Sequence, residues 1–348
     1  MPVAASVVKL PDAWFIACES HQLKQRPLGV TLQGVPMVLF RDGEGKAAAL
    51  LDRCPHRNAP LSLGKVVGGQ LQCAYHGWCF DGSGACRAVP GLVGETEVAL
   101  KSRAAEAYPC VEQDGYVWVY STPGEAPKEG PFHFPHLDEP GYTTVRRDFM
   151  LQSTLHAAVE NALDVPHTAF LHGGLFRTPE KKNEIEVVVR RHATYAEAEY
   201  VGEPRPTGLA GRILAPQGGT VVHFDRFLLP CIAQVEYRLG DRSHLLTTSV
   251  MVPIGDFETR VWSVVTFKLP VPAFLVRPFV TPVATRIFKQ DAVMLKAQTE
   301  VIHRFGAERF TSTELDVLGH EIWRLLEQHA QRKAPPEGVK EHRVRMRT

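Results

Sequence analysis

The sequence predicts an α+β protein with two domains: an all-β domain on the N-terminal side, and a second domain in which helices accompany a curved antiparallel sheet. Three observations support this fold class. Short apolar runs separated by turn residues fill the first 120 residues, a loop rich in Pro and Gly follows at 121–140, and long alternating segments then lead into two helical stretches. The 348 residues exceed one typical domain and fit two. We therefore predict domains at 1–120 and 121–348.

The first domain has the pattern of antiparallel hairpins. Apolar runs of strand length lie at 14–18 and 35–40, and the second is followed by a turn rich in Asp and Gly. A further turn is predicted at 81–84, and 108–120 reads as a strand pair around Asp114 and Gly115. A small all-β domain accounts for these segments.

The second domain combines two kinds of periodicity. Residues 148–172 show helical spacing of apolar positions, and helices are also predicted at 281–305 and 312–331. Some five or six strands in succession predict one curved antiparallel sheet. They are expected at 184–189, 195–201, 221–229, 232–239, 245–252 and 261–269. The charged tail from residue 333 is expected to fray or to form an interface arm.

Composition limits the class of protein. Hydrophobic residues make up 44% and charged residues 22%, as in an ordinary globular protein that is large enough to bury a substantial core. The formal net charge of +1 gives no reason to expect binding to nucleic acid or to an anionic membrane. The seven cysteines show no disulfide framework, which fits a reducing cytoplasm.

No segment of the sequence reads as a membrane anchor. The first residues lack the basic and apolar regions of a signal peptide, and no run reaches about 18 uninterrupted apolar residues. The nearest approach is 269–288, but arginines and prolines interrupt it, so we interpret it as a buried or pocket-lining segment. We expect a cytoplasmic protein without a membrane span.

Two Cys and two His of the first domain form two mixed pairs in the sequence, Cys54 with His56 and Cys73 with His76. Thiolates and imidazoles at such spacings suit a metal centre. Zinc would accept all four in one tetrahedron, whereas a Rieske [2Fe–2S] cluster places both Cys on one iron and both His on the other. Zinc sites usually group Cys with Cys and His with His. Because each pair here is mixed, each loop can give one ligand to each iron, and the order favours the Rieske cluster.

A second group with metal-ligand chemistry lies on the predicted central helix. Asn161, Asp164 and His167 are spaced by three and share roughly one helix face. His172 would lie about 140° from His167 on a regular helix, but Pro166 can distort the helix and bring the two imidazoles together. Two His and a carboxylate form the facial triad of non-haem Fe(II) oxygenases. Taken alone, the two histidines fit ordinary packed side chains equally well. The Rieske motif upstream favours a metal site, because an electron-transfer cluster needs a second redox centre to which it passes its electrons.

With these motifs the chain resembles a Rieske non-haem iron oxygenase, the terminal oxygenase component (α subunit). The matching patterns are Cys-x-His…Cys-x-x-His, then Asn-x-x-Asp-x-x-His-x-x-x-x-His, then Asp291 in a predicted helix. The resemblance implies a Rieske domain at 1–120, a helix-grip (START-like) catalytic domain at 121–348, and a mononuclear iron held by His167, His172 and Asp291. One Asp in a helix is a weak motif, so Glu160 and Asp316 compete with Asp291.

Asp164 has its own role by this resemblance. It is similar to the carboxylate that bridges an iron-ligand histidine, here His167, to His76 of the partner subunit. Such a carboxylate fixes the imidazole and offers a hydrogen-bonded route for electrons. The contact implies a head-to-tail homotrimer, because heterologous contacts commonly close into rings. The alternative is a helix-surface Asp without such a partner.

The resemblance also implies an activity. Electrons from a separate ferredoxin or flavin reductase would pass through the cluster to the mononuclear iron, which activates O₂. The glycine pattern at 43–48 lies in a turn and opens no helix, so NAD(P)H is expected to act only indirectly, through the reductase. The chain is similar to the single-subunit-type monooxygenase and demethylase members, so we favour hydroxylation or oxidative demethylation of an apolar aromatic or alicyclic molecule.

Two alternatives remain beside this function. One is a cis-dihydroxylating ring dioxygenase. The other is a Rieske-type electron carrier without oxygenase activity, which would need neither the long second domain nor the second His pair.

Several residues of the second domain are candidates for lining the substrate pocket, although simple core packing explains each apolar one as well. These are Phe176, Phe224, Phe227, Leu228, Ile232 and Met251, with Asn161 of the central helix.

Overall fold

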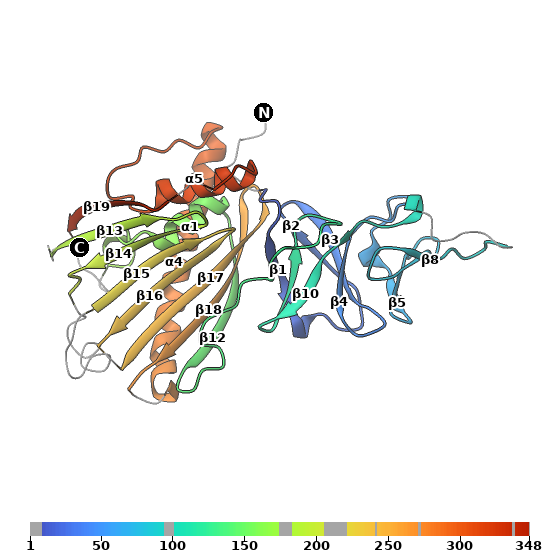
Figure 1. Ribbon diagram of the computed structural model, residues 1–348, viewed down its shortest axis with the longest axis horizontal. Coiled ribbons are helices and arrows are strands. Elements are labelled where there is room, and N and C mark those ends of the chain that lie inside the picture. The colour runs from blue at the N-terminus through green and yellow to red at the C-terminus, as the bar shows by residue number, and fades with distance from the viewer. Residues whose placement is uncertain are drawn as a thin grey trace. The chain divides into compact units, whose positions relative to one another are not determined.

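A computed structural model of the chain describes residues 9–93, 101–173, 183–204, 221–240, 242–270, 273–335 and 338–347. The chain forms two compact units, one of residues 10–133 and one that contains residues 134–348 (Figure 1). The division lies inside the loop at 121–140. An all-β unit followed by a unit with a large antiparallel sheet and helices confirms the predicted fold class.

The first unit consists of short antiparallel strands. Its described sheets have the strand orders β1-β11-β10, β2-β3-β4-β9 and β5-β6-β7-β8. The strands are β1 (Trp14–Glu19), β2 (Leu28–Leu32), β3 (Val35–Arg41), β4 (Ala47–Leu51), β5 (Lys65–Val67), β6 (Gln70–Gln72), β7 (Cys79–Phe80), β8 (Cys86–Ala88), β9 (Ala107–Tyr108), β10 (Cys110–Gln113) and β11 (Tyr116–Tyr120). Short 3-10 turns lie at Ser20–Gln22, Leu61–Leu63 and Lys101–Arg103.

Two-residue loops close several of these hairpins. Both residues of each loop have positive φ, which is the backbone of a type I′ turn, and its twist matches that of the paired strands. The loops are Gln33-Gly34, Gly68-Gly69 and Asp114-Gly115. At Gly69 a β-carbon would lie 2.2 Å from the Cα of Gly43, so no other residue fits there without moving the backbone. The local sequence therefore sets the strand register of this unit.

The second unit is built on one large sheet of order β12-β18-β17-β16-β15-β14-β13-β19, in which neighbouring strands pair antiparallel. Its strands are β12 (Thr143–Leu151), β13 (Glu184–Arg191), β14 (Tyr195–Val201), β15 (Val221–Leu228), β16 (Ile232–Leu239), β17 (Ser243–Gly255), β18 (Glu258–Lys268) and β19 (Lys340–Arg347). The described helices are α1 (Leu155–Leu163), α2 (Thr168–Leu171), α4 (Ala273–Phe305) and α5 (Gly319–Ala330). None of the described helices has both the length and the apolar composition needed to cross a bilayer.

The helices α1 and α4 lie against one face of this sheet (Figure 1). The ring of Phe288 on α4 lies 4.8 Å from that of Phe149 on β12. Strand register places Phe149 beside Val261, and Val261 beside Met251, so these three side chains share the face that α4 covers. Helix α1 packs against β15, β16 and β17. The iron-ligand candidates therefore come from elements on this helix-covered face.

The expectation for the C-terminal tail is wrong. Residues 340–347 form β19, which pairs with the edge strand β13. The charges that suggest a solvated tail face opposite charges across the two strands: Arg347 lies 3.1 Å from Glu184, and Arg190 lies 3.0 Å from Glu341. Cross-strand pairs of opposite charge stabilise a sheet edge, and one strand read alone does not reveal them.

The last helix is shorter than predicted. It begins at Gly319 instead of residue 312, because Thr313 and Asp316 form a local turn. The backbone N–H of Thr313 donates to the Asp316 carboxylate (2.6 Å), and the N–H of Asp316 donates to the Thr313 carbonyl (3.2 Å). Such side-chain to backbone bonds compete with helix formation.

A buried histidine forms a charged cluster on the helix-covered face. The ring of His223 is stacked between Tyr200 (4.3 Å) and Tyr237 (4.0 Å). Its Nδ1 lies 2.6 Å from the Glu203 carboxylate and its Nε2 lies 3.0 Å from that of Asp225. Burial alone would lower the pKa of His223, but the two carboxylates outweigh it and raise the pKa to about 9.

Stability is therefore expected to fall on the alkaline side. The folded-state pKa of His223 lies above the unfolded value of about 6.5, so its contribution is complete below that pH and is lost as the pH rises through about 9. The shift corresponds to roughly 2–4 kcal/mol. Urea unfolding between pH 6 and 10 measures it: His223→Asn should flatten the decline, whereas His342→Asn, exposed on β19, should keep the wild-type slope. Equal slopes for wild type and His223→Asn would contradict this assignment.

Candidate metal centres

The two Cys/His loops of the first unit have the same backbone hydrogen bonds. The N–H of Cys54 donates to the carbonyl of Ala59 (2.8 Å), and the N–H of Asn58 donates back to the Cys54 carbonyl (2.9 Å). In the second loop the N–H of Cys73 donates to the carbonyl five residues on (2.8 Å), and the N–H of Gly77 donates back to Cys73 (3.1 Å). Asn58 and Gly77 both have positive φ, 59° and 72°. Both loops are thus tight turns with the same backbone conformation, and each presents one thiol and one imidazole.

The side chains of these loops are brought together. Cys54 and Cys73 are buried, 2% and 3% exposed, in a core that includes Phe40, Leu50 and Phe80. The rings of His56 and His76 lie 4.6 Å apart at the more exposed side. Burial raises the pKa of the Cys54 thiol to about 11, with the Cys73 thiol beside it. Two buried thiols of this kind become thiolates only with a strong cationic partner, so the donor set fits a [2Fe–2S] cluster with two imidazoles on its outer iron.

In the second unit, the predicted distortion of the central helix is a complete break. Helix α1 ends at Leu163, and Asp164 is extended with φ −90° and ψ 105°. Pro166 has no N–H to donate and disfavours helical backbone at the residue before it. The short helix α2 then starts at Thr168. The break lets His167 and His172 meet, which their spacing of five would prevent on a regular helix.

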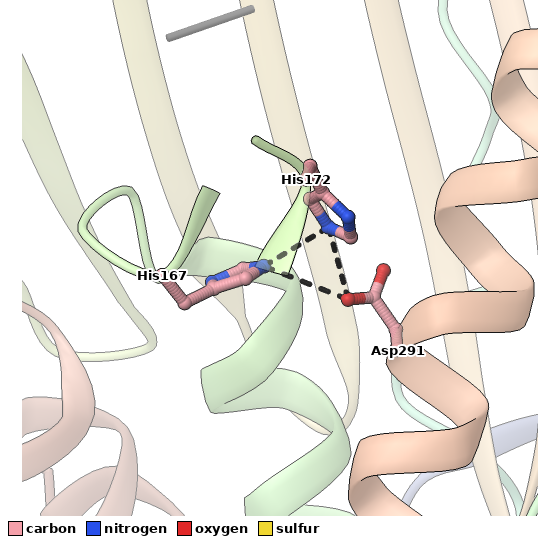
Figure 2. A group of neighbouring side chains, drawn as sticks. All are labelled: His167, His172 and Asp291. Atoms are coloured by element: carbon pink, nitrogen blue, oxygen red, sulfur yellow. Dashed lines mark hydrogen bonds and ion pairs between the residues drawn. The ribbon is translucent and has the colours of Figure 1, made fainter. Parts of the chain in front are cut away.

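The structure brings His167, His172 and Asp291 into one group (Figure 2). The Nε2 atoms of the two histidines are 3.3 Å apart. Asp291 Oδ1 lies 3.0 Å from His172 Nε2 and 3.6 Å from His167 Nε2. His172 is 2% exposed, and Asp291 Oδ1 is buried without a hydrogen bond. Three ligand atoms that converge in this way fit a divalent cation, and two His with one carboxylate leave positions open on it.

Two further side chains orient these histidines. Asp164 Oδ2 lies 3.3 Å from His167 Nδ1, and Gln290 Oε1 lies 3.1 Å from His172 Nδ1. Burial opposes the charge on His167, but Asp164 and Asp291 outweigh it and raise its pKa to about 9. Acceptors on both Nδ1 atoms favour the tautomer whose Nε2 is free to bind a metal. The sequence did not predict the contact of Gln290 with His172. The one signal for it in the sequence is that Gln290 directly precedes Asp291.

The competing carboxylates lie elsewhere. Glu160 and Asp316 line a separate small cavity of about 50 Å³ together with Asp164. Burial, with Asp316 and Asp164 nearby, raises the pKa of Glu160 to about 7. Neither Glu160 nor Asp316 belongs to the three-residue group. The geometry therefore favours Asp291 as the third ligand.

The pocket candidates fall on both faces of the sheet. Phe227 shares the helix-covered face with Met251, because register aligns it with Ala233 and Ser249, and Met251 is two residues further on. Ile232 aligns with Val250 on the opposite face.

Phe224 also lies on that opposite face, where its ring is 4.5 Å from the guanidinium of Arg226. Leu228 aligns with Ile232 there. Asn161 lies on α1, outside the metal-ligand group. Phe176 lies outside the described residues. The placement supports Phe227 and Met251 as pocket candidates and gives no support to Phe224, Leu228 or Ile232.

Two family models match the chain. Residues 13–104 match the Rieske [2Fe–2S] domain, and residues 151–332 match the vanillate O-demethylase oxygenase C-terminal domain. The first contains the Cys/His loops. The second contains the three-residue group and covers just over half of the chain.

Several known proteins are similar to this chain in sequence or in fold. The dicamba O-demethylase oxygenase component of Stenotrophomonas maltophilia is 36% identical over 182 residues, 51% of this chain and 52% of that protein. Protein TIC 55 of Arabidopsis thaliana chloroplasts is 29% identical over 289 residues, 79% of this chain and 51% of that protein. The matches thus span about half the length of these relatives. The crystal structure of dicamba monooxygenase bound to dicamba has the same fold, with a TM-score of 0.73 at 23% identity over 94% of this chain and 98% of that one.

Proposed function

The chain belongs to the Rieske non-haem iron oxygenases with a catalytic domain of the vanillate O-demethylase type, and we propose that it is a terminal oxygenase that hydroxylates or oxidatively demethylates a small aromatic or alicyclic molecule. Members of this family carry a Rieske [2Fe–2S] cluster and a mononuclear iron and use O₂ as co-substrate. The observation that carries the proposal is the presence of both donor sets in one chain: two Cys and two His in the first unit, and the His167, His172 and Asp291 group in the second.

The residues around the mononuclear site have distinct tasks in this proposal. His167, His172 and Asp291 would hold the iron, which supplies O₂ activation when bound. Asp164 and Gln290 keep the two imidazoles in the ligating orientation. Phe227 and Met251 supply apolar surface on the same face of the sheet, which would exclude water from the substrate.

The electrons come from another protein in this proposal. A ferredoxin or flavin reductase would reduce the cluster in a reducing cytoplasm, and NAD(P)H would be oxidised there. We further propose a head-to-tail homotrimer in which Asp164 links His167 to His76 of the partner subunit. The exposure of His76, and the position of Asp164 at the end of α1, support such a contact. The match of residues 151–332 to an oxygenase domain favours the enzyme over an electron carrier.

Oxygen consumption with product analysis tests this function. Protein reconstituted with iron and sulfide should hold about three irons per chain, and a generic ferredoxin and reductase can supply electrons. Demethylation of a methoxy compound uses one O₂, two electrons and two protons, and yields the hydroxyl compound, formaldehyde and water. We expect about one formaldehyde per O₂ with a suitable methoxy aromatic substrate. A cis-diol that carries both oxygen atoms would identify the dioxygenase alternative, and a protein with about two irons per chain and no substrate-dependent O₂ uptake would contradict the oxygenase.

A further inference from the structure

Trp78 places its ring flat against the imidazole of His56. The two ring centroids lie 4.7 Å apart, and the planes of the rings differ by only 3°. His56 belongs to the first Cys/His loop, whereas Trp78 directly follows the residues of the second. The contact therefore joins the two loops that present the cluster ligands, and it fixes the plane of one of the two imidazoles.

The backbone around Trp78 determines where its ring points. The N–H of Cys73 donates to the Trp78 carbonyl (2.8 Å), and this bond closes the second loop. Gly77, with φ 72°, supplies the left-handed backbone that turns the chain just before Trp78. Cys79, the residue after Trp78, donates its thiol hydrogen to the Gly77 carbonyl (3.3 Å). The direction of the indole is thus set by the same turn that positions the ligands Cys73 and His76.

The two imidazoles have different aromatic neighbours. Trp78 is half-buried and packs against the buried core that contains Cys54 and Cys73, so its ring is held from behind. The ring centroid of Tyr75 lies 3.8 Å from that of His76, but Tyr75 directly precedes His76 in the chain, is tilted by 39° and is 65% exposed. Of these two rings, the indole is therefore the one that the core braces.

The indole of Trp78 can favour one oxidation state of the cluster. The face of an aromatic ring carries negative partial charge, so it attracts a positive group and repels a negative one. An oxidised cluster with two thiolate and two neutral imidazole ligands has no net charge, and reduction by one electron makes it negative. The face of Trp78 against His56 would therefore favour the oxidised state. The indole also keeps water from that side of the imidazole, and the exclusion of water disfavours the more highly charged, reduced state.

Simple packing is the competing explanation, because a large aromatic side chain beside a core stabilises a domain through its buried area alone. Two features argue for more than packing. Trp78 is half-exposed, whereas the rings of Phe40 and Phe80 in the same core are fully buried. The indole is also parallel to the imidazole of His56, which brings its negative face onto a cluster ligand.

We propose that Trp78 is a positioning residue of the cluster: its indole holds the plane of His56 and lowers the reduction potential, which makes an electron on the cluster easier to pass on. The role follows from the contact of the indole with a ligand imidazole and from the support of the indole by the core. It concerns the cluster that family membership implies, and it does not depend on the proposed oxygenase reaction.

Redox titration and EPR spectroscopy of the protein loaded with iron and sulfide test this role without turnover. Trp78→Leu removes the aromatic face and keeps an apolar side chain. At a given potential, we expect the ratio of reduced to oxidised cluster to be roughly three- to tenfold higher in this variant, which corresponds to a rise in midpoint potential of roughly 30–60 mV for one electron. The EPR signal of the reduced variant should broaden, because the plane of His56 is no longer fixed.

Conservative and matched variants separate the aromatic face from packing. Trp78→Phe keeps a flat ring against His56 and should restore most of the wild-type potential and EPR line shape. Trp14→Leu removes a half-buried tryptophan of the same unit whose ring contacts Tyr120 (5.3 Å) instead of a ligand imidazole, and it should leave both readouts unchanged. Urea unfolding measures the contribution of packing in each variant, and metal analysis with circular dichroism reports cluster content and folding.

Each outcome decides for or against this role. An unchanged potential and EPR signal in Trp78→Leu, or a shift of equal size in Trp78→Phe or Trp14→Leu, would overturn it. If Trp78→Leu does not retain its cluster, Trp78→Met gives the same comparison with a more flexible side chain. Loss of the cluster from both aliphatic variants but not from Trp78→Phe would support the role of the ring, whereas loss from all three would assign Trp78 to packing.

This test is separate from the test of the proposed function. If Trp78→Leu shows the expected shift but the wild-type protein shows no substrate-dependent O₂ uptake, the proposed function fails and the role of Trp78 stands. If the wild-type protein turns over a substrate and the potential of Trp78→Leu is unchanged, the function stands and the role of Trp78 fails.

Discussion

Asp291→Ala is expected to abolish turnover and to remove about one iron per chain, while the visible spectrum of the Rieske cluster remains. The reason is geometric. Asp291 Oδ1 lies beside the Nε2 atoms of both His167 and His172, at 3.6 and 3.0 Å. Without it, two imidazoles would remain, and their affinity for Fe(II) is too low to retain the metal. Metal analysis after gel filtration and the absorbance of the cluster give the two readouts.

Matched variants make this result specific. Glu160→Gln alters a half-buried carboxyl that lines the neighbouring cavity, and it should keep the mononuclear iron. Cys54→Ser should have the reciprocal effect, with loss of about two irons and of the visible spectrum while the mononuclear iron stays. If the Asp291→Ala protein keeps all of its iron and remains active, Asp291 is not the third iron ligand, and the assignment passes to Glu160 or Asp316.

Asp164→Asn is expected to keep every metal and still lose most of its activity. The amide has the size of the carboxylate but no charge, and Asp164 Oδ2 lies 3.3 Å from His167 Nδ1. In the proposed trimer the same side chain also reaches His76 of the partner subunit, so its loss interrupts the route between the two metal centres. Rapid mixing of the pre-reduced protein with substrate and O₂ should show that the cluster is re-oxidised about 100-fold more slowly, or slower still.

The oligomeric state and the metal content are the controls for this measurement. Sedimentation should give the same mass for wild type and variant, with about three irons per chain in both. A modest fall in activity with normal re-oxidation would mean that Asp164 only ends α1 and orients His167. That outcome would also remove the main reason to expect the two metal centres to meet across a subunit boundary.

Features that depend on local sequence are the ones that the sequence predicts. The two mixed Cys/His pairs lie on tight turns that short segments determine by themselves, and the fold class follows from periodicity. The break between α1 and α2 is foreseeable from Pro166, because a proline acts on its immediate neighbours. The order of the residues therefore shows how His167 and His172 can meet, and the Rieske motif upstream is what favours a metal site over ordinary packing for this pair.

Features that depend on distant segments are not predictable in this way. Alternation shows that Phe224 and Phe227 face opposite sides of β15, but only the position of α1 and α4 decides which side is covered. The strand β19 forms by pairing with the edge of β13, and more than a hundred residues separate the two. The contact of Gln290 with His172 likewise joins α4 to α2. Each of these requires tertiary packing, which overrides local preference.

The metal-ligand group joins two distant segments of the chain. His172 directly follows α2 and Asp291 lies on α4, 119 residues further on (291 − 172 = 119). A bound iron would therefore act as a cross-link that closes a long loop of the chain. Cross-links of long loops lower the entropy of the unfolded chain, and a metal that binds only the folded form stabilises it in proportion to the logarithm of its free concentration. The availability of iron would then set how long the second unit survives proteolysis, as well as how much active enzyme there is.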